Sequence, residues 1–304
     1  MVEMKPDAAS GRPAVAFIGT GIMGAPMCGH VLAAGYPTRV WNRTRAKAEP
    51  LAARGGRVCE SVAEAISGAD YVLCMLDTGD VIDHVLFSAT ARDAAAVDAL
   101  AKGAVLIVMS SIPVETTRRQ ATYLAARGVA YIDAPVSGGE RGAIERTLTI
   151  MAGGDENVVA HARSLLETMG RVTRVGPTGA GQLAKLANQA IVGITIGAVA
   201  EALSLARQGG ADLAAVRAAL LGGFADSAIL RQHGQRMIEG AFEPGGRARL
   251  QLKDLRTARL LAAELGIELP LLHLAERQFE HLCDRGLGDL DHSALYLLLD
   301  RSDV

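Results

Sequence analysis

The sequence is poor in aromatic residues and cysteine, and it lacks a large excess of either charge. Aromatic residues make up 4% of the 304 residues, which leaves few side chains to stack on exposed bases. The formal net charge is −2 and there is no long basic run, so we expect no nucleic-acid partner and no anionic membrane surface. The cysteines at 28, 59, 74 and 283 form no Cys-x-x-Cys pair, which argues against a disulfide framework or a zinc site.

An export signal and a long membrane segment are also missing from the sequence pattern. Residues 1–12 are polar and lack the apolar core of a signal peptide, and we expect them to form a disordered tail. The longest apolar stretch, around residues 190–200, is shorter than the roughly 20 residues that cross a bilayer. We therefore predict a cytoplasmic protein. The length of the chain favours two domains.

Strand and helix patterns alternate in the first half of the chain and give way to helices in the second. The β-rich apolar runs lie at residues 14–18, 38–42, 71–76, 105–109, 129–133 and 148–152. Such alternation predicts an α/β domain with a Rossmann-type, doubly wound parallel sheet over residues 13–176. Residues 177–304 predict an all-α domain, with helices at 178–208, 212–221, 227–239, 251–265, 270–285 and 292–300.

A glycine-rich pattern follows the first predicted strand. Gly19-x-Gly21-x-x-Gly24 stands between a strand and a helix, which is the context of a dinucleotide-binding loop. Turn-forming glycines are the alternative, because the bare pattern is weak. The first glycine would make the turn, the second would let the pyrophosphate approach, and the third would let helix and strand pack closely. We expect Ile22 and Met23 in the same loop to contact the cofactor.

The end of the second strand bears on the choice of cofactor. NAD sites usually place an acidic residue there for the ribose 2′-hydroxyl, whereas this chain has Asn42-Arg43-Thr44. A guanidinium can bind a 2′-phosphate with charge-assisted hydrogen bonds. Arg45 and Lys47 add positive charge, although a solvated basic loop would look similar. The pattern predicts NADPH in preference to NADH.

Two other strand ends face the same predicted edge of the sheet. Ser110 and Ser111 follow one strand, and Met75 and Leu76 end another. Ligands of doubly wound sheets bind outside the carboxyl ends of the strands. We therefore predict that all four residues lie beside the cofactor.

A polar group interrupts the apolar helix that begins near residue 178. Lys185, Asn188 and Gln189 are spaced i, i+3, i+4, which places them on one helix face. A lysine at the start of a buried helix is costly unless it is paired or used. A lysine that extends to solvent is the alternative for an isolated helix.

The chain resembles the β-hydroxyacid dehydrogenase family. The resemblance runs from about residue 14 to about 296 and rests on five segments: 19–27, 109–112, 133–140, 176–189 and 252–255. Within the family, segments 185–189 and 288–294 are most similar to the tartronate semialdehyde reductases. The resemblance implies a nucleotide-binding α/β domain, an all-α domain, and a homodimer or homotetramer.

The resemblance also implies roles for individual residues. Lys185 corresponds to the catalytic lysine and Asn188 to the active-site asparagine, next to Gln189. We expect Asn188 and Gln189 to hold the lysine ammonium and a substrate hydroxyl, and capping or core hydrogen bonding is the alternative role for both. Ser137, Gly138 and Gly139 correspond to the loop that holds the substrate carboxylate. Lys253 corresponds to a lysine that approaches cofactor and substrate. The chain departs from the family at Arg146, where a glycine is common; we expect a solvent-facing turn there.

These residues predict transfer of hydride from NAD(P)H to a small semialdehyde carboxylate, with Lys185 as general acid. Negative charge builds on the carbonyl oxygen during the transfer, and a positioned cation can stabilise and protonate it. Tartronate semialdehyde, reduced to D-glycerate, is the first choice of substrate. The alternatives are a 3-hydroxyisobutyrate dehydrogenase or a succinic semialdehyde reductase, then an imine reductase, or a cofactor-binding module without catalysis.

The histidines predict no metal site. His292 is preceded by Asp291, which favours a helix start capped by the aspartate. The remaining histidines, His233 among them, show no ligand spacing and no grouping with carboxylates in the sequence.

Overall fold

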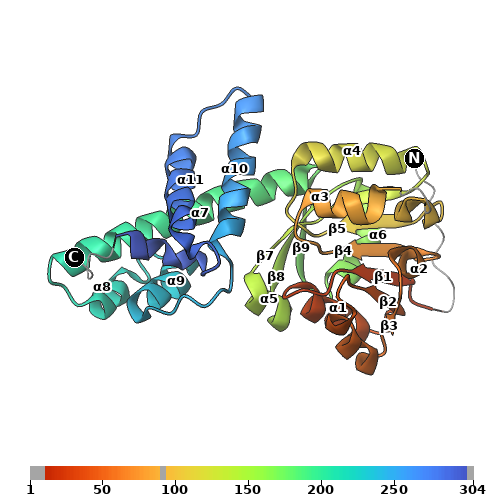
Figure 1. Ribbon diagram of the computed structural model, residues 1–304, viewed down its shortest axis with the longest axis horizontal. Helices are drawn as coiled ribbons and strands as arrows, with labels where there is room; N and C mark the ends of the chain where they lie inside the picture. Colours follow the sequence, from red (N-terminus) through yellow and green to blue (C-terminus); the bar gives the residue numbers. More distant parts are fainter. Residues whose placement is uncertain (1–10, 90–93, 300–304) are drawn as a thin grey trace. The chain divides into compact units, whose positions relative to one another are not determined.

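The computed structural model describes residues 11–89 and 94–299. The chain divides into two compact units, an N-terminal unit that ends at Lys185 and a C-terminal unit that begins at Leu186 (Figure 1). The division falls inside one long helix, α7 (Ala180–Gln208), which therefore belongs to both units. The predicted tail at 1–12 lies outside the described residues for positions 1–10.

A single mixed sheet forms the centre of the N-terminal unit. In the described part of the chain its strand order is β3-β2-β1-β4-β5-β6-β8-β7, with β9 paired to β8. The strands are β1 (Val15–Ile18), β2 (Thr38–Trp41), β3 (Arg57–Val58), β4 (Tyr71–Cys74), β5 (Val105–Val108), β6 (Ala130–Asp133), β7 (Val136–Ser137), β8 (Leu148–Gly153) and β9 (Gly170–Gly176). The predicted Rossmann-type sheet is confirmed.

The sheet is parallel from β3 to β6 and changes direction beyond β6. Strand β8 runs antiparallel to both β6 and β7, and parallel to β9. The segment 138–147 between β7 and β8 is shorter than the dozen or so residues that a parallel crossover requires, so the chain returns as an antiparallel strand. The sequence did not reveal β3, β7 and β9, because two of them are very short and β9 carries mainly exposed residues.

Helices cover both faces of the sheet, and Figure 1 shows α1 on one face with α3 and α4 on the other. Strands β1, β4, β5 and β6 are completely buried, as expected for strands covered on both sides. Their side chains alternate between two hydrophobic clusters, one packed on α1 and α6 and the other on α3 and α4. The helices are α1 (Gly24–Ala33), α2 (Val62–Ile66), α3 (Gly79–Ile82), α4 (Val114–Ala125), α5 (Gly139–Glu145) and α6 (Glu156–Leu166).

Helices alone form the C-terminal unit in its described residues, as predicted. They are the distal part of α7, then α8 (Leu213–Leu220), α9 (Ala228–Glu239), α10 (Ala248–Glu264), α11 (Pro270–Leu282) and the 3-10 helix η6 (His292–Leu298). The last element was expected to be an α-helix, and the structure shows the tighter 3-10 form. Short 3-10 or π turns lie at η1 (Arg45–Lys47), η2 (Glu49–Arg54), η3 (Asp83–Phe87), η4 (Ala96–Ala99) and η5 (Cys283–Leu287).

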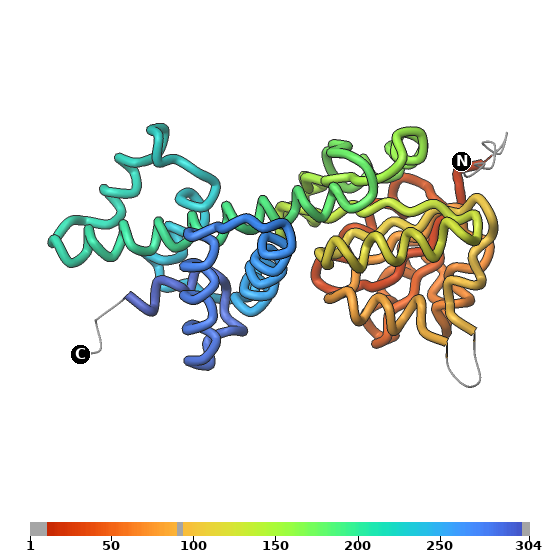
Figure 2. The backbone as a smooth tube through the Cα atoms, turned by 90° about the horizontal axis from the view of Figure 1, so that it is seen from above, coloured from red at the N-terminus to blue at the C-terminus, as the bar shows by residue number. Residues whose placement is uncertain are grey.

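Helix α7 matches the predicted length closely but is more exposed than its apolar sequence suggested. It continues unbroken for 29 residues (Figure 2), and its most apolar 18-residue window has a mean hydropathy of 1.6 with 33% of the window buried. Length and composition alone would therefore let α7 cross a membrane, which the apolar stretch at 190–200 did not indicate. Apolar side chains on it remain uncovered in the single chain, including Ile191 at 67% and Leu205 at 76% exposure.

Candidate functional site

The glycine loop after β1 has one open position between two crowded ones. A Cβ on Gly19, whose φ is +97°, would lie 2.2 Å from the Met75 carbonyl oxygen, and a Cβ on Gly24 would lie 2.0 Å from the Gly19 carbonyl oxygen. A Cβ on Gly21 would meet no described heavy atom within 4 Å. The first and third glycines thus allow close packing, and the second leaves its backbone accessible to a ligand, as a dinucleotide-binding loop requires. Ile22 is 56% exposed beside this open position, whereas Met23 packs against the core.

The residues after β2 have different roles from one another. Asn42 connects the two loops, since its Oδ1 accepts the Thr20 N–H at 3.0 Å and its Nδ2 donates to the Thr44 carbonyl oxygen at 2.9 Å. Arg45 pairs with Glu60 at 2.5 Å and with Glu49 at 3.3 Å. Arg43 is exposed and forms no ion pair with any residue that the structure describes. Of the two arginines here, Arg43 is therefore the one whose guanidinium is available to a ligand.

Hydrogen bonds connect the strand ends with the start of α7. The Ser110 hydroxyl accepts the Leu76 N–H at 2.9 Å, and the Ser110 carbonyl accepts the Gln182 Nε2 at 2.9 Å. The Ile112 N–H donates to Gln182 Oε1 at 3.1 Å. The predicted residues Met75, Leu76, Ser110 and Ser111 thus follow the ends of the adjacent strands β4 and β5, and Ser110 is hydrogen-bonded to the first turn of α7. Lys185, half-buried, follows Gln182 on this helix.

Asp133, the last residue of β6, anchors the same turn from a buried position. Its Oδ1 accepts the Gly179 N–H at 2.8 Å, and its Oδ2 accepts the Gln182 N–H at 2.9 Å. Burial raises the pKa of Asp133 to about 6, although the backbone donors of Gly179 and Gln182 lower it. The sequence signalled Asp133 only as part of a motif, and nothing in the sequence singled out Gln182.

The predicted carboxylate loop begins at the end of β7. Gly138 and Gly139 have φ values of +135° and +60°, which glycine adopts without strain. A Cβ on Gly139 would meet no described atom within 4 Å, so its backbone is open to a ligand. Arg146 ends α5 with φ +61°, and its Nε donates to the Thr168 carbonyl at 3.1 Å. Arg146 is exposed, which fits the predicted solvent-facing turn.

A second polar network lies in the C-terminal unit. Gln189 Nε2 donates to Asp254 Oδ2 at 2.7 Å and to Gln251 Oε1 at 3.1 Å, and its Oε1 accepts Asn188 Nδ2 at 2.9 Å. Lys253 Nζ lies 3.1 Å from Asp254 Oδ1. The structure thus brings Asn188, Gln189 and Lys253 together through Asp254, to which the sequence pattern assigned no role beyond its place in segment 252–255. The amide N–H groups of Gln189 are both used inside this unit, so its expected contact with a substrate hydroxyl would have to involve its oxygen.

The expectation that His233 has no carboxylate neighbour was wrong. His233 Nδ1 lies 3.5 Å from Asp291 Oδ1, and His233 Nε2 lies 3.1 Å from His292 Nε2. The fold brings α9 and the start of η6 together, which the separation in sequence concealed. Asp291 caps η6 as predicted and also accepts the Gly245, Gly246 and Ser293 N–H groups. Burial raises its pKa, but the close contact with His233, the charge of His292 and the hydrogen bonds from Ser293 lower it well below the usual range.

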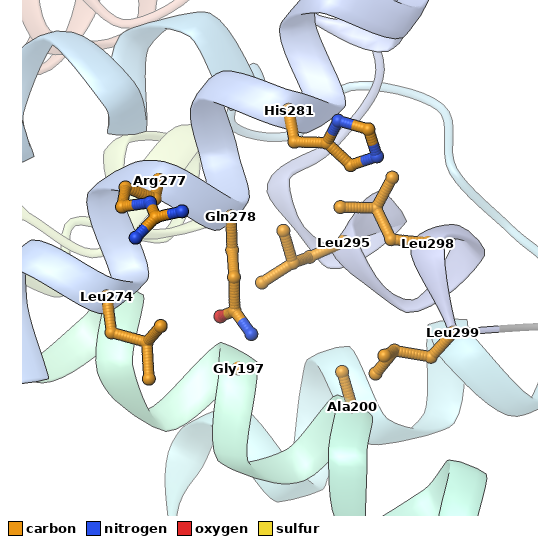
Figure 3. A pocket seen from close by; sticks show the side chains of 9 residues that line it. All are labelled: Gly197, Ala200, Leu274, Arg277, Gln278, His281, Leu295, Leu298 and Leu299. Atoms are coloured by element: carbon orange, nitrogen blue, oxygen red, sulfur yellow. The ribbon is translucent and has the colours of Figure 1, made fainter.

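Two cavities lie away from these residues. The cavity in Figure 3 has a volume of about 360 Å³ in the C-terminal unit, and side chains of α7, α11 and η6 surround it. A second cavity of about 690 Å³ lies between α4, β6 and the start of α6. Neither cavity contains a predicted site residue.

Comparisons with known proteins agree with this arrangement. Residues 14–178 match the NAD binding domain of 6-phosphogluconate dehydrogenase, and residues 179–299 match the NAD-binding family of NADP-dependent 3-hydroxyisobutyrate dehydrogenase. The chain is 40% identical to 2-hydroxy-3-oxopropionate reductase of Escherichia coli (strain K12), over 93% of this chain and 96% of that protein. It is 31% identical to an NAD-dependent L-serine dehydrogenase of Pseudomonas aeruginosa, over 94% of this chain and 97% of that protein.

A solved structure extends the comparison to three dimensions. The Mycobacterium tuberculosis 3-hydroxyisobutyrate dehydrogenase, determined with L-serine, has a TM-score of 0.85 and 31% identity. The alignment covers 94% of this chain and 99% of that chain. The two-unit plan is therefore shared along almost the whole length.

Proposed function

The chain belongs to the β-hydroxyacid dehydrogenase (3-hydroxyisobutyrate dehydrogenase) family of NAD(P)-dependent oxidoreductases, and from this premise we propose that it reduces a small semialdehyde carboxylate with NADPH. The observation that carries the proposal is the position of Lys185. It follows the turn of α7 that is hydrogen-bonded to the ends of β5 and β6, at the edge where the glycine loop also lies. A cation held there can act on a group bound at the cofactor site.

Lys185 is the general acid of the proposed reaction. Its ammonium donates a proton to the carbonyl oxygen as negative charge develops, and the same cation stabilises that charge before the proton moves. A bound nicotinamide cofactor would supply the hydride. The residues fit such a cofactor, because Gly21 leaves an open approach to the backbone at the start of α1, where helix N–H groups favour phosphate.

The backbone N–H groups of Ser137, Gly138 and Gly139 are proposed to hold the substrate carboxylate. The positive φ values of the two glycines turn the chain sharply, and successive N–H groups in such turns form anion-binding concavities. From the resemblance, Lys253 is also proposed to approach the substrate, and within the C-terminal unit its Nζ lies 3.1 Å from Asp254 Oδ1. A small substrate with one carboxylate and one nearby aldehyde fits these residues, because the loop at 137–139 would bind the carboxylate and Lys185 would act on the aldehyde.

NADPH is the proposed cofactor because no carboxylate stands at the end of β2. Asn42 is engaged with the glycine loop, and the exposed Arg43 next to it has the charge and planar donors for a 2′-phosphate. Thr44 adds a hydroxyl to the same loop. Glu60 and Glu49 engage Arg45 instead, which leaves the discrimination to Arg43.

Tartronate semialdehyde is the proposed substrate, and D-glycerate is the product. The support is the resemblance of segments 185–189 and 288–294 to reductases of that aldehyde, together with the 40% identity to the 2-hydroxy-3-oxopropionate reductase of E. coli. Methylmalonate semialdehyde and succinic semialdehyde are the alternatives within the same reaction class.

A homodimer or larger assembly is proposed from the surface of α7. Ile191 and Leu205 are exposed apolar residues on a helix that is only 33% buried over its most apolar window. Large uncovered apolar surfaces on a helix usually mark an interface. A second copy of the chain, packed along the C-terminal unit, is the occupant that we propose.

A panel of aldehydes tests the proposed reaction. The kcat/KM values with NADPH are measured for tartronate, succinic and methylmalonate semialdehydes, and for an uncharged aldehyde of equal length. We expect the three carboxylates to react, tartronate semialdehyde most efficiently, and the uncharged aldehyde to react poorly. Efficient turnover of the uncharged aldehyde alone would refute the carboxylate assignment.

A further inference from the structure

The start of α7 rests on a carboxylate that is completely enclosed. Asp133 is 0% exposed and pairs with no basic side chain in the described residues, so its charge is balanced by backbone donors alone. These donors are the N–H groups of Gly179, which precedes α7, and of Gln182, the third residue of α7. A negative charge at a helix N-terminus is favoured by the unpaired N–H groups and by the helix dipole.

The surroundings of Asp133 leave no room for an alternative arrangement. A Cβ on Gly153 would lie 2.6 Å from Asp133 Oδ1, and a Cβ on Gly181 would lie 2.8 Å from Oδ2 and 2.4 Å from the Met151 carbonyl oxygen. Two glycines therefore let the helix approach the carboxylate closely. The close contact fixes where the helix starts and how it is rotated.

Gln182 holds the same turn from its other side. Its Nε2 donates to the Ser110 carbonyl and its Oε1 accepts the Ile112 N–H, at 2.9 and 3.1 Å, and all three residues are buried or nearly so. One side chain thus satisfies both a donor and an acceptor of the loop after β5. Together with Asp133, it attaches the first turn of α7 to the ends of two central strands.

We propose that Asp133 and Gln182 are positioning residues that hold Lys185 at the reacting centre. Lys185 lies three residues beyond Gln182, which is less than one helical turn, and it is the last residue of the N-terminal unit. The position of its ammonium relative to the glycine loop therefore depends on how this turn is anchored. The proposal rests on the proposed role of Lys185 in the reaction.

The matched substitutions are Asp133→Asn and Asp155→Asn. Asn at 133 keeps the shape of the side chain, but its NH₂ group cannot accept a hydrogen bond. One of the Gly179 and Gln182 N–H groups therefore loses its acceptor, which loosens the first turn of α7. Asp155 caps α6 in the same unit by accepting the Asn157 and Val158 N–H groups, and α6 carries no proposed site residue. Gln182→Met removes the side-chain hydrogen bonds to Ser110 and Ile112 without adding a charge. It is the variant to measure if Asp133→Asn does not fold.

Turnover is the first measurement. We expect Asp133→Asn to lower kcat by about 10²-fold, the cost of a displacement of roughly 1 Å at a reacting group, with little change in the KM for NADPH. The KM should be preserved because the glycine loop has its own contacts. Asp155→Asn should leave kcat unchanged. A wild-type kcat in both Asp133→Asn and Gln182→Met would overturn the proposal.

Hydrogen exchange and lysine labelling provide readouts that do not depend on activity. In Asp133→Asn we expect faster amide exchange at residues 179–185 and faster reaction of Lys185 with an amine-specific reagent, relative to the exposed Lys102. If the wild-type enzyme reduced no semialdehyde, the proposed function would fail while these readouts still decided whether Asp133 positions Lys185. Unchanged exchange and labelling in a folded Asp133→Asn would contradict the positioning role.

Discussion

Removal of the Arg43 guanidinium should separate NADPH from NADH. The Arg43 side chain is exposed and forms no ion pair with described residues. The 2′-phosphate of a bound NADPH would therefore be its main charged partner. One charge-assisted hydrogen bond contributes about 1.5–3 kcal/mol. Arg43→Ala should therefore weaken NADPH binding by about 10- to 150-fold and leave NADH binding nearly unchanged.

Arg45 provides a control two residues away. It already pairs with Glu60 at 2.5 Å and Glu49 at 3.3 Å, and exposed pairs of this kind are worth about 0.2–1 kcal/mol. The free energy of a contact between Arg45 and a phosphate would be partly offset by the loss of its pairs with Glu60 and Glu49. Arg45→Ala should thus weaken NADPH binding several-fold less than Arg43→Ala, and Glu60→Gln should strengthen it slightly by releasing Arg45.

Isothermal titration with each cofactor at fixed ionic strength measures these effects, because charge–phosphate contacts weaken with salt. An equal loss of NADPH and NADH affinity in Arg43→Ala would refute the reasoning. So would an effect of Arg45→Ala as large as that of Arg43→Ala.

Three further perturbations test other parts of the structure. Gly21→Ala should keep the wild-type Tm but lose cofactor affinity, because a Cβ there meets no described atom within 4 Å. Gly24→Ala should lower the Tm, because its Cβ would lie 2.0 Å from the Gly19 carbonyl oxygen. Equal Tm values of the two variants by calorimetry would contradict this. Burial raises the pKa of Asp133 from 3.8 to about 6 in the folded protein. The protonated side chain therefore stabilises the fold fully below pH 3.8, and this stabilisation is lost as the pH rises through 6. Urea unfolding should therefore show the stability of the wild type relative to Asp133→Asn falling by roughly 2 kcal/mol between pH 4 and 7, and a rise would be inconsistent with a buried carboxylate. Ile191→Glu should shift the protein to monomers in light scattering while exposed Ile144→Glu does not; a wild-type monomer would exclude the α7 interface.

Local patterns in the sequence were sufficient for most of the fold. Each long strand of the sheet is an uninterrupted apolar run because it is covered on both faces, and the glycine loop is recognisable because strand and helix directly flank it. The short strands β3 and β7 carry too few residues for a periodic pattern. The antiparallel direction of β8 depends on its pairing partners, which no local pattern encodes.

The candidate site was predictable where residues act from their own loop, and it was not where distant residues meet. Arg43 and Gly21 could be identified from the sequence because each follows the end of a predicted strand. The bond between Asp133 and Gln182 joins residues 49 apart, and that between Gln189 and Asp254 joins residues 65 apart. The same is true of His233 and His292, which are 59 apart. Only the packing of the elements reveals such pairs.

The turnover of Lys185→Ala decides whether Lys185 is the general acid. Tartronate semialdehyde reduction is followed by NADPH oxidation, with NADPH binding measured separately and Lys102→Ala as the control. We expect kcat to fall by about 10²–10⁴-fold, the usual loss when a general acid is removed, while the affinity for NADPH stays nearly unchanged. Turnover near that of the wild type would contradict this role of Lys185.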